Sequence, residues 1–388
     1  MLAHSPPLPL VIDYQYHGIT AKDQKALILA LAQRDRVHRI RLSLPALKLQ
    51  KIIIAIDGEY PILDYLILMD PPNYKNTVLF LPETLQTPNL RHLAVDGSIP
   101  IWPPLLGTAA GLVNLHLTLF HPSTYFQPAD LLQSLSLMPQ LELFLIYFHF
   151  FVPERDVEMQ LMHTPIMAHV TLPVLRYFAF QAVGAYSEAV LSRITSPRLQ
   201  TFQICYPRQL MFSVPQLVQF MGRTKNLRFD RVKFHFENRR VYVEVNPAEN
   251  NLSVDVFSII VHCSPLGWQV SSVAQISNAL SQIFSVVGHL TLVYQVQSWS
   301  SEEHHEVDRI EWRKLLRSFS NARTLRVYRG LVGEIARSLE LDDGEHPLEL
   351  LPELHALTFS WSGDVIYAFT SFIDARKNAG RPVTLIRS

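Results

Sequence analysis

The sequence shows no excess of either charge, because 34 Lys and Arg residues are balanced by 34 Asp and Glu residues and the formal net charge is zero. A chain without a net positive field does not attract nucleic acid or an anionic membrane electrostatically. Cysteine occurs only twice, as Cys205 and Cys263, both within apolar runs. Two cysteines are too few for a disulfide framework, so we expect a reducing compartment and two thiols packed as small core residues.

Glycine is sparse, with 14 residues, and no GxGxxG, GxxxxGK[ST], GxSxG or HExxH pattern is present. Long apolar runs are missing too, since stretches such as 141–152 fall short of the ~20 residues that a membrane-spanning helix needs. The first residues, MLAHSPPLPLVIDY, lack a basic segment followed by an apolar one. The sequence therefore predicts no catalysis, no cofactor, no membrane segment and no secretion, with an intracellular location in cytoplasm or nucleus.

One pattern recurs along the chain: a turn residue, often proline, then an apolar residue, two variable residues and an apolar-x-apolar strand. The clearest copies are TPNLRHLAV (87–95), AAGLVNLHL (109–117), LPVLRYFAF (172–180), SPRLQTFQI (196–204) and LPELHALTF (351–359). The first apolar positions of all copies are Val37, Leu63, Leu90, Leu112, Leu141, Leu175, Leu199, Ala322 and Leu354, with Leu227 and Leu290 as looser members.

The spacing of these copies predicts the fold class. It brackets the 20 to 29 residues of leucine-rich repeats, in which each unit supplies one strand and a return segment. We therefore predict an α/β fold, a leucine-rich-repeat-like solenoid with a curved parallel sheet and helices or irregular segments on the convex side. It would span residues 1–388 as a single irregular domain of about 11 to 12 repeats. The first, fourth and sixth positions of each copy should face inward.

Helical spacing of apolar residues predicts return helices in five segments. These are 21–33, 273–287, 306–319, 331–341 and 365–373. Between Arg231 and Asn251 the repeat lapses into strict alternation of apolar and polar residues, which predicts a hairpin or irregular strands. We expect the irregular part of the solenoid to lie around 228–256.

Clusters of titratable residues do not assemble into a metal or catalytic site. Glu302, Glu303, His304, His305 and Glu306 are adjacent on a predicted helix start, where neighbouring side chains point about 100° apart and cannot share one ion. Asp342, Asp343, Glu345 and His346 surround Gly344 but lack the alternating oxygen ligands and terminal glutamate of a calcium loop. His262 and Cys263 should face opposite sides of a strand, so a thiolate–imidazole pair is disfavoured against core packing. No metal site is expected.

The variable strand positions nominate a binding surface, because in a solenoid they line one concave face. Aligning the copies predicts three rows: His92, Asn114, Leu143, Tyr177 and Thr201; Ala94, His116, Leu145, Ala179 and Gln203; and Asp96, Thr118, Tyr147, Gln181 and Cys205. From these rows, the candidate protein-binding residues are His92, Asn114, His116, Tyr147, Tyr177, Gln181 and Gln203. The run at 141–151 is apolar throughout, so a register slip of one residue would instead turn Tyr147 inward and Phe144 outward.

Several phrases resemble a known family, the F-box-like leucine-rich-repeat proteins of basidiomycete fungi. They include PLPLVIDY, LPETLQTPNLRHL, HPSTYFQPADLLQSLSLMPQLE, PIMAHVTLPVLRYF and AFTSFIDARKNAGRPVTLI. The resemblance implies a substrate-recognition repeat domain of a cullin-RING ubiquitin ligase, which would bind a protein substrate. The N-terminal F-box that docks on the Skp-type adaptor is not expected here, so adaptor binding would need an upstream F-box. The alternative is a free-standing leucine-rich-repeat interaction protein without a role in ubiquitination.

Overall fold

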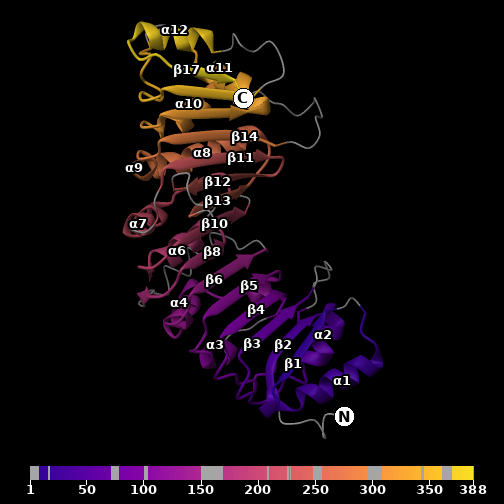
Figure 1. Ribbon diagram of the computed structural model, residues 1–388. Coiled ribbons are helices and arrows are strands. Elements are labelled where there is room, and N and C mark those ends of the chain that lie inside the picture. Colours follow the sequence, from indigo (N-terminus) through magenta and orange to yellow (C-terminus); the bar gives the residue numbers. More distant parts are fainter. Residues whose placement is uncertain are drawn as a thin grey trace. The chain divides into compact units, whose positions relative to one another are not determined.

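The computed structural model describes residues 8–15, 18–70, 78–99, 104–149, 169–207, 209–224, 227, 229–247, 256–295, 308–341, 345–360 and 369–387. The chain divides into two compact units, unit 1 from Met1 to Leu199 and unit 2 from Gln200 to Ser388. Within the described residues the main strands number fifteen, seven in unit 1 and eight in unit 2 (Figure 1). Most neighbouring strands run parallel and helices lie between them, which confirms the α/β class with a large, open, mostly parallel sheet arrangement.

Unit 1 is built on seven strands that pair in the order of the sequence, every pair parallel. They are β1 (Leu10–Gln15), β2 (Val37–Ser43), β3 (Tyr65–Met69), β4 (His92–Gly97), β5 (Asn114–Leu119), β6 (Leu143–Phe148) and β8 (Tyr177–Gln181). A separate two-stranded parallel sheet joins β7 (Val170–Thr171) and β9 (Ile194–Thr195).

The return segments of unit 1 contain short helices, as parallel strands require a crossover between them. They are α1 (Ala21–Leu31), α2 (Ala46–Ile53), α3 (Pro104–Thr108), α4 (Pro128–Ser136), α6 (Gly184–Leu191) and the 3-10 turns η2 (Arg34–Arg36) and η3 (Pro122–Thr124). Helix α1 begins with a capping box, in which the Thr20 hydroxyl accepts from the Asp23 backbone N–H and the Asp23 carboxylate accepts from the Thr20 backbone. This confirms the helix expected at 21–33.

Unit 2 departs from sequence order at one place. Its strands are β10 (Thr201–Pro207), β11 (Arg231–Glu237), β12 (Arg240–Asn246), β13 (Phe257–His262), β14 (His289–Tyr294), β15 (Thr324–Tyr328), β16 (Ala356–Ser360) and β17 (Thr384–Arg387). They lie in the order β10-β13-β12-β11-β14-β15-β16-β17. Strand β12 runs antiparallel to both β11 and β13, whereas β10 with β13, β11 with β14, and the successive pairs from β14 to β17 are parallel. The alternating segment is therefore a hairpin, as expected, and its second strand is inserted into the parallel sheet.

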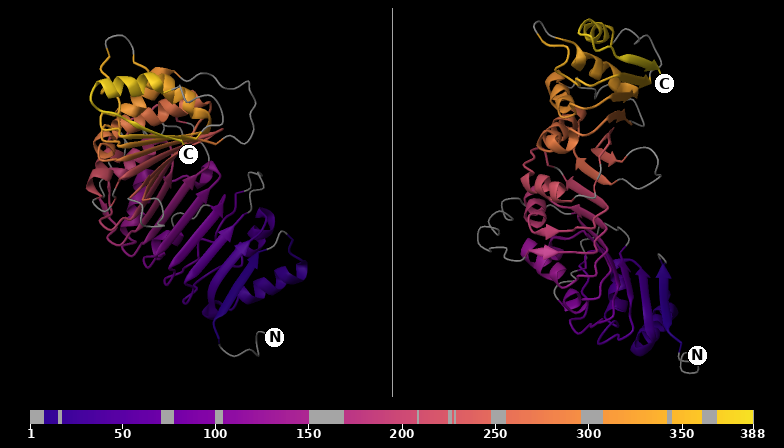
Figure 2. Two further views of the ribbon diagram at one scale, coloured as in Figure 1. Left: turned by 45° about the horizontal axis from the view of Figure 1, so that its top comes forward. Right: turned by 60° about the vertical axis from the view of Figure 1, so that its left-hand side comes forward.

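Helices α8, α10 and α11 lie on one side of the strands of unit 2 (Figure 2). The helices of this unit are α7 (Pro215–Arg223), α8 (Leu266–Ala279), α9 (Ser281–Phe284), α10 (Arg309–Arg317), α11 (Val332–Leu339) and α12 (Thr370–Asn378), with the 3-10 turn η4 (Arg329–Leu331). Helices expected at 306–319 and 331–341 are confirmed by α10 and α11. The one expected at 273–287 begins earlier, at Leu266, and is interrupted at Leu280. Of the segment 365–373, residues 365–368 lie outside the described residues.

Most copies of the repeat share the same backbone hydrogen bonds. The backbone N–H of the first apolar residue donates to the carbonyl of the residue three before it and so closes a turn. In the copy at 87–95, the Leu90 N–H donates to the Thr87 carbonyl at 3.1 Å. The next carbonyl, that of Arg91, then accepts from both Val113 N–H and Asn114 N–H of the following copy, at 2.8 and 3.0 Å. Two consecutive N–H groups of the following copy also donate to one carbonyl at five further positions: Val113, Glu142, Asp230, Gly288 and Arg323.

The inward positions are buried as the repeat predicts. In the copy at 87–95, Leu90, Leu93 and Val95 are at most 1% exposed. The corresponding residues of the copies at 109–117, 172–180 and 351–359 are buried as well. Burial of these apolar side chains, worth about 1.5–3 kcal/mol each, fixes which face of every strand turns inward.

The two looser members of the repeat have different outcomes, and only Leu290 was aligned wrongly. Val287, not Leu290, closes the turn, on the Phe284 carbonyl, and Leu290 and Leu292 are the buried strand residues that follow. Leu227 is buried and closes a turn on the Thr224 carbonyl at 3.3 Å, as expected of a first position. The carbonyl that accepts from Gly288 and His289 is that of Asp230, so two more residues separate Leu227 from its strand than in the copy at Leu90. The degenerate sequence hid these shifts because several neighbouring residues are apolar.

Candidate protein-binding face

The parallel register of unit 1 assembles the expected rows on one face of its strands. His92 pairs with Asn114, Asn114 with Leu143, and Leu143 with Tyr177. The second row is Ala94, His116, Leu145 and Ala179, and the third is Asp96, Thr118, Tyr147 and Gln181. The register predicted from the repeat is thus confirmed within unit 1. The function of these rows in binding a partner stays a prediction.

Burial decides the strand orientation that the apolar run at 141–151 left open. In β6 the side chains of Phe144, Ile146 and Phe148 are buried, whereas Leu143, Leu145 and Tyr147 between them are half-exposed. Strands β3 and β4 show the same alternation. Tyr147 therefore faces outward, and the alternative register with Phe144 outward is excluded. Residues 150 and 151 of the run lie outside the described residues.

Two candidates and three other row members differ from the rest, and of these row members Ala179 and Thr118 are buried in unit 1. Gln181 keeps its place in the third row but is only 8% exposed, and its amide donates to the Phe148 carbonyl at 3.0 Å. Its amide is used within the fold, so we correct its assignment as an accessible contact. Gln203 is half-exposed but belongs to β10 of unit 2, where it pairs with Ser258 of β13. Cys205 of β10 is buried, with only 2% exposed, despite its expected place in the third row.

Aromatic and polar side chains stack across the first row and extend it beyond the predicted residues. The His92 and Asn114 side chains are joined by a hydrogen bond of 2.9 Å between Nδ1 and Nδ2. The Tyr65 ring lies 5.7 Å from the His92 ring, and the Arg39 guanidinium lies 4.2 Å above the Tyr65 ring. Arg39 and Tyr65 are in register with His92. Sequence reasoning missed both, although they occupy variable strand positions in the copies whose first apolar residues are Val37 and Leu63.

His116 is the centre of a second contact group. Its Nε2 is 3.1 Å from the Thr118 hydroxyl, and its ring meets the Tyr147 ring edge-on at 6.0 Å. Burial lowers the pKa of His116, so its imidazole is neutral near pH 7. His149 follows β6 and stacks on Phe120 at 4.8 Å, and burial lowers its pKa too. The face therefore presents neutral donors and acceptors beside aromatic rings.

Two carboxylates meet where β3 and β4 end. Asp70 follows β3, and its backbone N–H donates to the Asp96 carbonyl at 2.8 Å. One oxygen of each carboxyl group is buried without a hydrogen-bond partner. Burial raises the pKa of Asp96, and burial together with the nearby Asp96 raises the pKa of Asp70 to about 6. A hydrogen bond from the Ala46 backbone at the start of α2 acts in the opposite direction on Asp70.

The two thiols have the buried positions expected of them. Cys263 is 8% exposed while His262 beside it is half-exposed, consistent with opposite sides of β13. Burial raises the pKa of Cys205 to about 12 and raises that of Cys263 as well, so both stay protonated near pH 7. Neutral thiols are poor nucleophiles and poor metal ligands.

The structure describes only part of the two titratable clusters at 302–306 and 342–346. Residues 302–306 lie outside the described residues, and so do Asp342 and Asp343. Glu345 is described, and its carboxylate accepts from the buried Arg313 guanidinium at 2.6 Å. Across the described ranges, no group of three His, Cys, Asp or Glu side chains is placed to hold a metal ion.

The helices of the described part of the chain are all too short or too polar to cross a membrane. When the chain is compared with protein-family models, none matches. No curated protein matches it either. The fungal F-box-like resemblance accordingly stays a resemblance, and the site has to be interpreted from its own geometry.

Proposed function

We propose that this chain is a leucine-rich-repeat-like solenoid that works as a non-catalytic scaffold for binding another protein. The observation that supports the proposal most strongly is the outward face of β3, β4 and β6, where alternate side chains remain half-exposed while their neighbours are buried. Asn114 and His116 of β5 and Tyr177 of β8 are half-exposed on the same face, whereas the rest of β8 is buried. The double backbone bonds that link one copy to the next support a stacked-repeat architecture.

The chemistry of the face suits a protein partner. Tyr65, Tyr147 and Tyr177 offer large rings with a polar group, and tyrosine is enriched where interfaces bind most tightly. His92 and Asn114 add hydrogen-bonding groups held in place by their mutual contact. Leu143 and Leu145 provide apolar area between them. An interface of this kind combines an apolar centre with polar groups of fixed position.

Within this proposal, the resemblance to the fungal family favours the substrate-recognition domain of an F-box ubiquitin-ligase subunit. The alternative is a free-standing repeat protein of the same architecture, without a link to ubiquitin. Both would be intracellular and both would use the same face, so the partner distinguishes them. Co-purification with the Skp-type adaptor, using this chain with and without any upstream coding sequence, separates the two. Adaptor binding by the longer form alone supports the ligase receptor, and no binding by either form supports the free-standing protein.

A photo-crosslinking residue tests the face itself. Benzoyl-phenylalanine at Leu143, in the first row, should form a specific adduct with a partner in cells that express the protein. The same residue at Gln133, exposed on α4, serves as the matched control. We further expect that Tyr147→Ala weakens binding of the captured protein about tenfold or more, whereas Gln133→Ala leaves it unchanged. Capture from Gln133 but not from Leu143, or an unchanged affinity for Tyr147→Ala, would contradict the proposal.

A further inference from the structure

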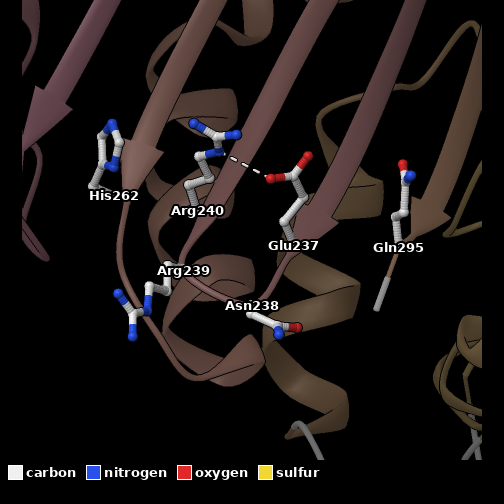
Figure 3. A pocket seen from close by; sticks show the side chains of 6 residues that line it. All are labelled: Glu237, Asn238, Arg239, Arg240, His262 and Gln295. Atoms are coloured by element: carbon white, nitrogen blue, oxygen red, sulfur yellow. Dashed lines mark hydrogen bonds and ion pairs between the residues drawn. The ribbon is translucent and has the colours of Figure 1, made fainter. Parts of the chain in front are cut away.

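The turn between β11 and β12 forms one side of a hollow in unit 2 (Figure 3). Its volume is about 540 Å³, and its lining residues are Glu237, Asn238, Arg239, Arg240, His262 and Gln295. They come from the end of β11, the start of β12, the end of β13 and the residue after β14. Strands β11, β13 and β14 run in the same direction, so the hollow lies at their carboxyl ends, where open parallel sheets bind ligands.

Arg240 is held in a fixed orientation at this hollow. Its Nε donates to Glu237 Oε2 at 2.9 Å, and its guanidinium lies 4.7 Å from the centre of the Tyr242 ring. The hydrogen bond to Glu237 raises the pKa of Arg240, which keeps the group charged. Among the described residues, this bond uses Nε alone and leaves both terminal nitrogens without an acceptor. A guanidinium presents such a pair of donors to a carboxylate in the bidentate geometry.

The other lining groups set the charge that the hollow prefers. Arg239 and Asn238 are exposed at the turn, and Figure 3 shows the Arg239 and Arg240 guanidinium groups on opposite sides of the backbone. Among the lining residues that the structure describes, two arginines against one glutamate leave a single positive charge when His262 is neutral. That excess attracts anionic ligands, and the planar carboxylate group matches the paired donors of the Arg240 guanidinium. Asn238 and Gln295 add neutral hydrogen-bonding groups.

We propose that this hollow is a binding site for a carboxylate-bearing ligand, with Arg240 as the bidentate anchor and Arg239 as the second cation. The volume lies in the range of about 300–1,000 Å³ that holds ligands larger than a single ionic group, so the carboxylate belongs to a longer molecule. That molecule is either an acidic peptide segment or a free dicarboxylate. The site does not rest on the proposed sheet-face function, because all of its lining residues belong to unit 2.

A charge series at Asn238 tests the proposal in the full-length protein. Asn238 is exposed at the tip of the hairpin, so substitution there leaves the core intact. Glutarate binding is measured by calorimetry, and binding of a fluorescein-labelled pentaglutamate peptide is measured by anisotropy, both at low salt. Asn238→Asp should weaken binding about fivefold and Asn238→Lys should tighten it about fivefold, as expected for one added charge near the ligand. Arg240→Gln should weaken binding at least about tenfold.

Arg198→Gln is the control, because Arg198 is an exposed arginine of unit 1. It should bind both probes as the wild type does. Saturable binding of pentaglutamate alone assigns the site to an acidic peptide, and saturable binding of glutarate assigns it to a free dicarboxylate. Absence of binding to both probes overturns the proposal. Tighter binding of inorganic phosphate than of glutarate, or a change of the same sign for Asn238→Asp and Asn238→Lys, overturns it too.

Discussion

Individual residues show how neighbouring strands change the chemistry of a side chain. Asp70 and Asp96 are separated by a whole repeat copy in the sequence, yet they meet because β3 and β4 end side by side. Burial without full hydrogen bonding raises the pKa of both groups. Each carboxyl group therefore binds its proton more tightly in the folded protein than in the unfolded chain. As the pH rises from the ordinary pKa of these groups to their raised pKa in the folded protein, their ionisation makes the folded state less stable.

We expect Asp70→Asn to remove this pH-dependent loss of stability. With a folded pKa of about 6 and an ordinary value of 3.8, the loss is absent below pH 3.8 and complete above pH 6. After discounting for its partial exposure, the loss amounts to about 1 kcal/mol. The free energy of unfolding of Asp70→Asn, relative to wild type, should rise by that amount between pH 4 and pH 7.5 in urea titrations. Equal differences at the two pH values would show that Asp70 ionises normally.

Secondary-structure elements are joined by buried polar side chains as well as by apolar packing. Arg376 of α12 is fully buried, and its guanidinium donates to the backbone carbonyls of Leu351, Pro352 and Leu354. These carbonyls belong to the turn of the preceding repeat copy, where Leu351 has a left-handed φ of 50°. One cation thus satisfies three acceptors of an irregular turn. Without it, the carbonyls of Pro352 and Leu354 would lose this donor, whereas the Leu351 carbonyl would keep its bond from the Leu354 N–H.

Replacing Arg376 should therefore cost far more than replacing an exposed arginine nearby. We expect Arg376→Gln to lower the free energy of unfolding by about 2–4 kcal/mol, because the carbonyls of Pro352 and Leu354 lose this donor. Arg381→Gln is the matched control: its ion pair with Glu353 is long, at 3.4 Å, and about half-exposed. That substitution should cost at most about 1 kcal/mol. Similar losses for the two variants in chemical denaturation would refute the capping function of Arg376.

At the scale of each whole unit, the sheet contacts join nearest neighbours, which is the pattern that the proposed repeat array predicts. Neighbouring strands pair with each other, and several copies donate two backbone hydrogen bonds to the copy before them. In such arrays stability is a sum over repeats and over the interfaces between nearest neighbours. The buried side chain of Phe144 stacks on Phe178 of the next strand at 5.3 Å, so its packing extends over one neighbouring repeat.

This pattern predicts that a core defect spreads only locally. Phe144→Ala should lower stability by about 3–5 kcal/mol and should increase amide hydrogen exchange in β5, β6 and β8. Exchange in β15 and β16 of unit 2 should stay as in the wild type. Tyr147→Ala on the same strand, at a half-exposed position, should cost only about 1 kcal/mol. Uniformly faster exchange along the whole chain would argue against the array.

The sequence by itself determined most of the local structure of this protein. Alternation of apolar residues defined the inward face of the strands, and the turn before each copy set its start, because both depend on residues close in sequence. That was sufficient to predict the α/β class, the row register from His92 to Tyr177 and the hairpin after Arg231. It failed at Leu290, where the apolar residue Val287 close by made two alignments equally plausible, and it did not show the two additional residues between Leu227 and its strand.

Only the tertiary structure decided which of these positions are accessible and which distant groups meet. Gln181 is covered although its row neighbour Tyr147 is half-exposed, and Tyr65 joins His92 from a copy with a weak signature. The insertion of β12 between β13 and β11 brought Arg240 beside His262 at one hollow. Exposure and pairing of this kind depend on side chains supplied by other strands. Periodicity within one segment contains no information about them.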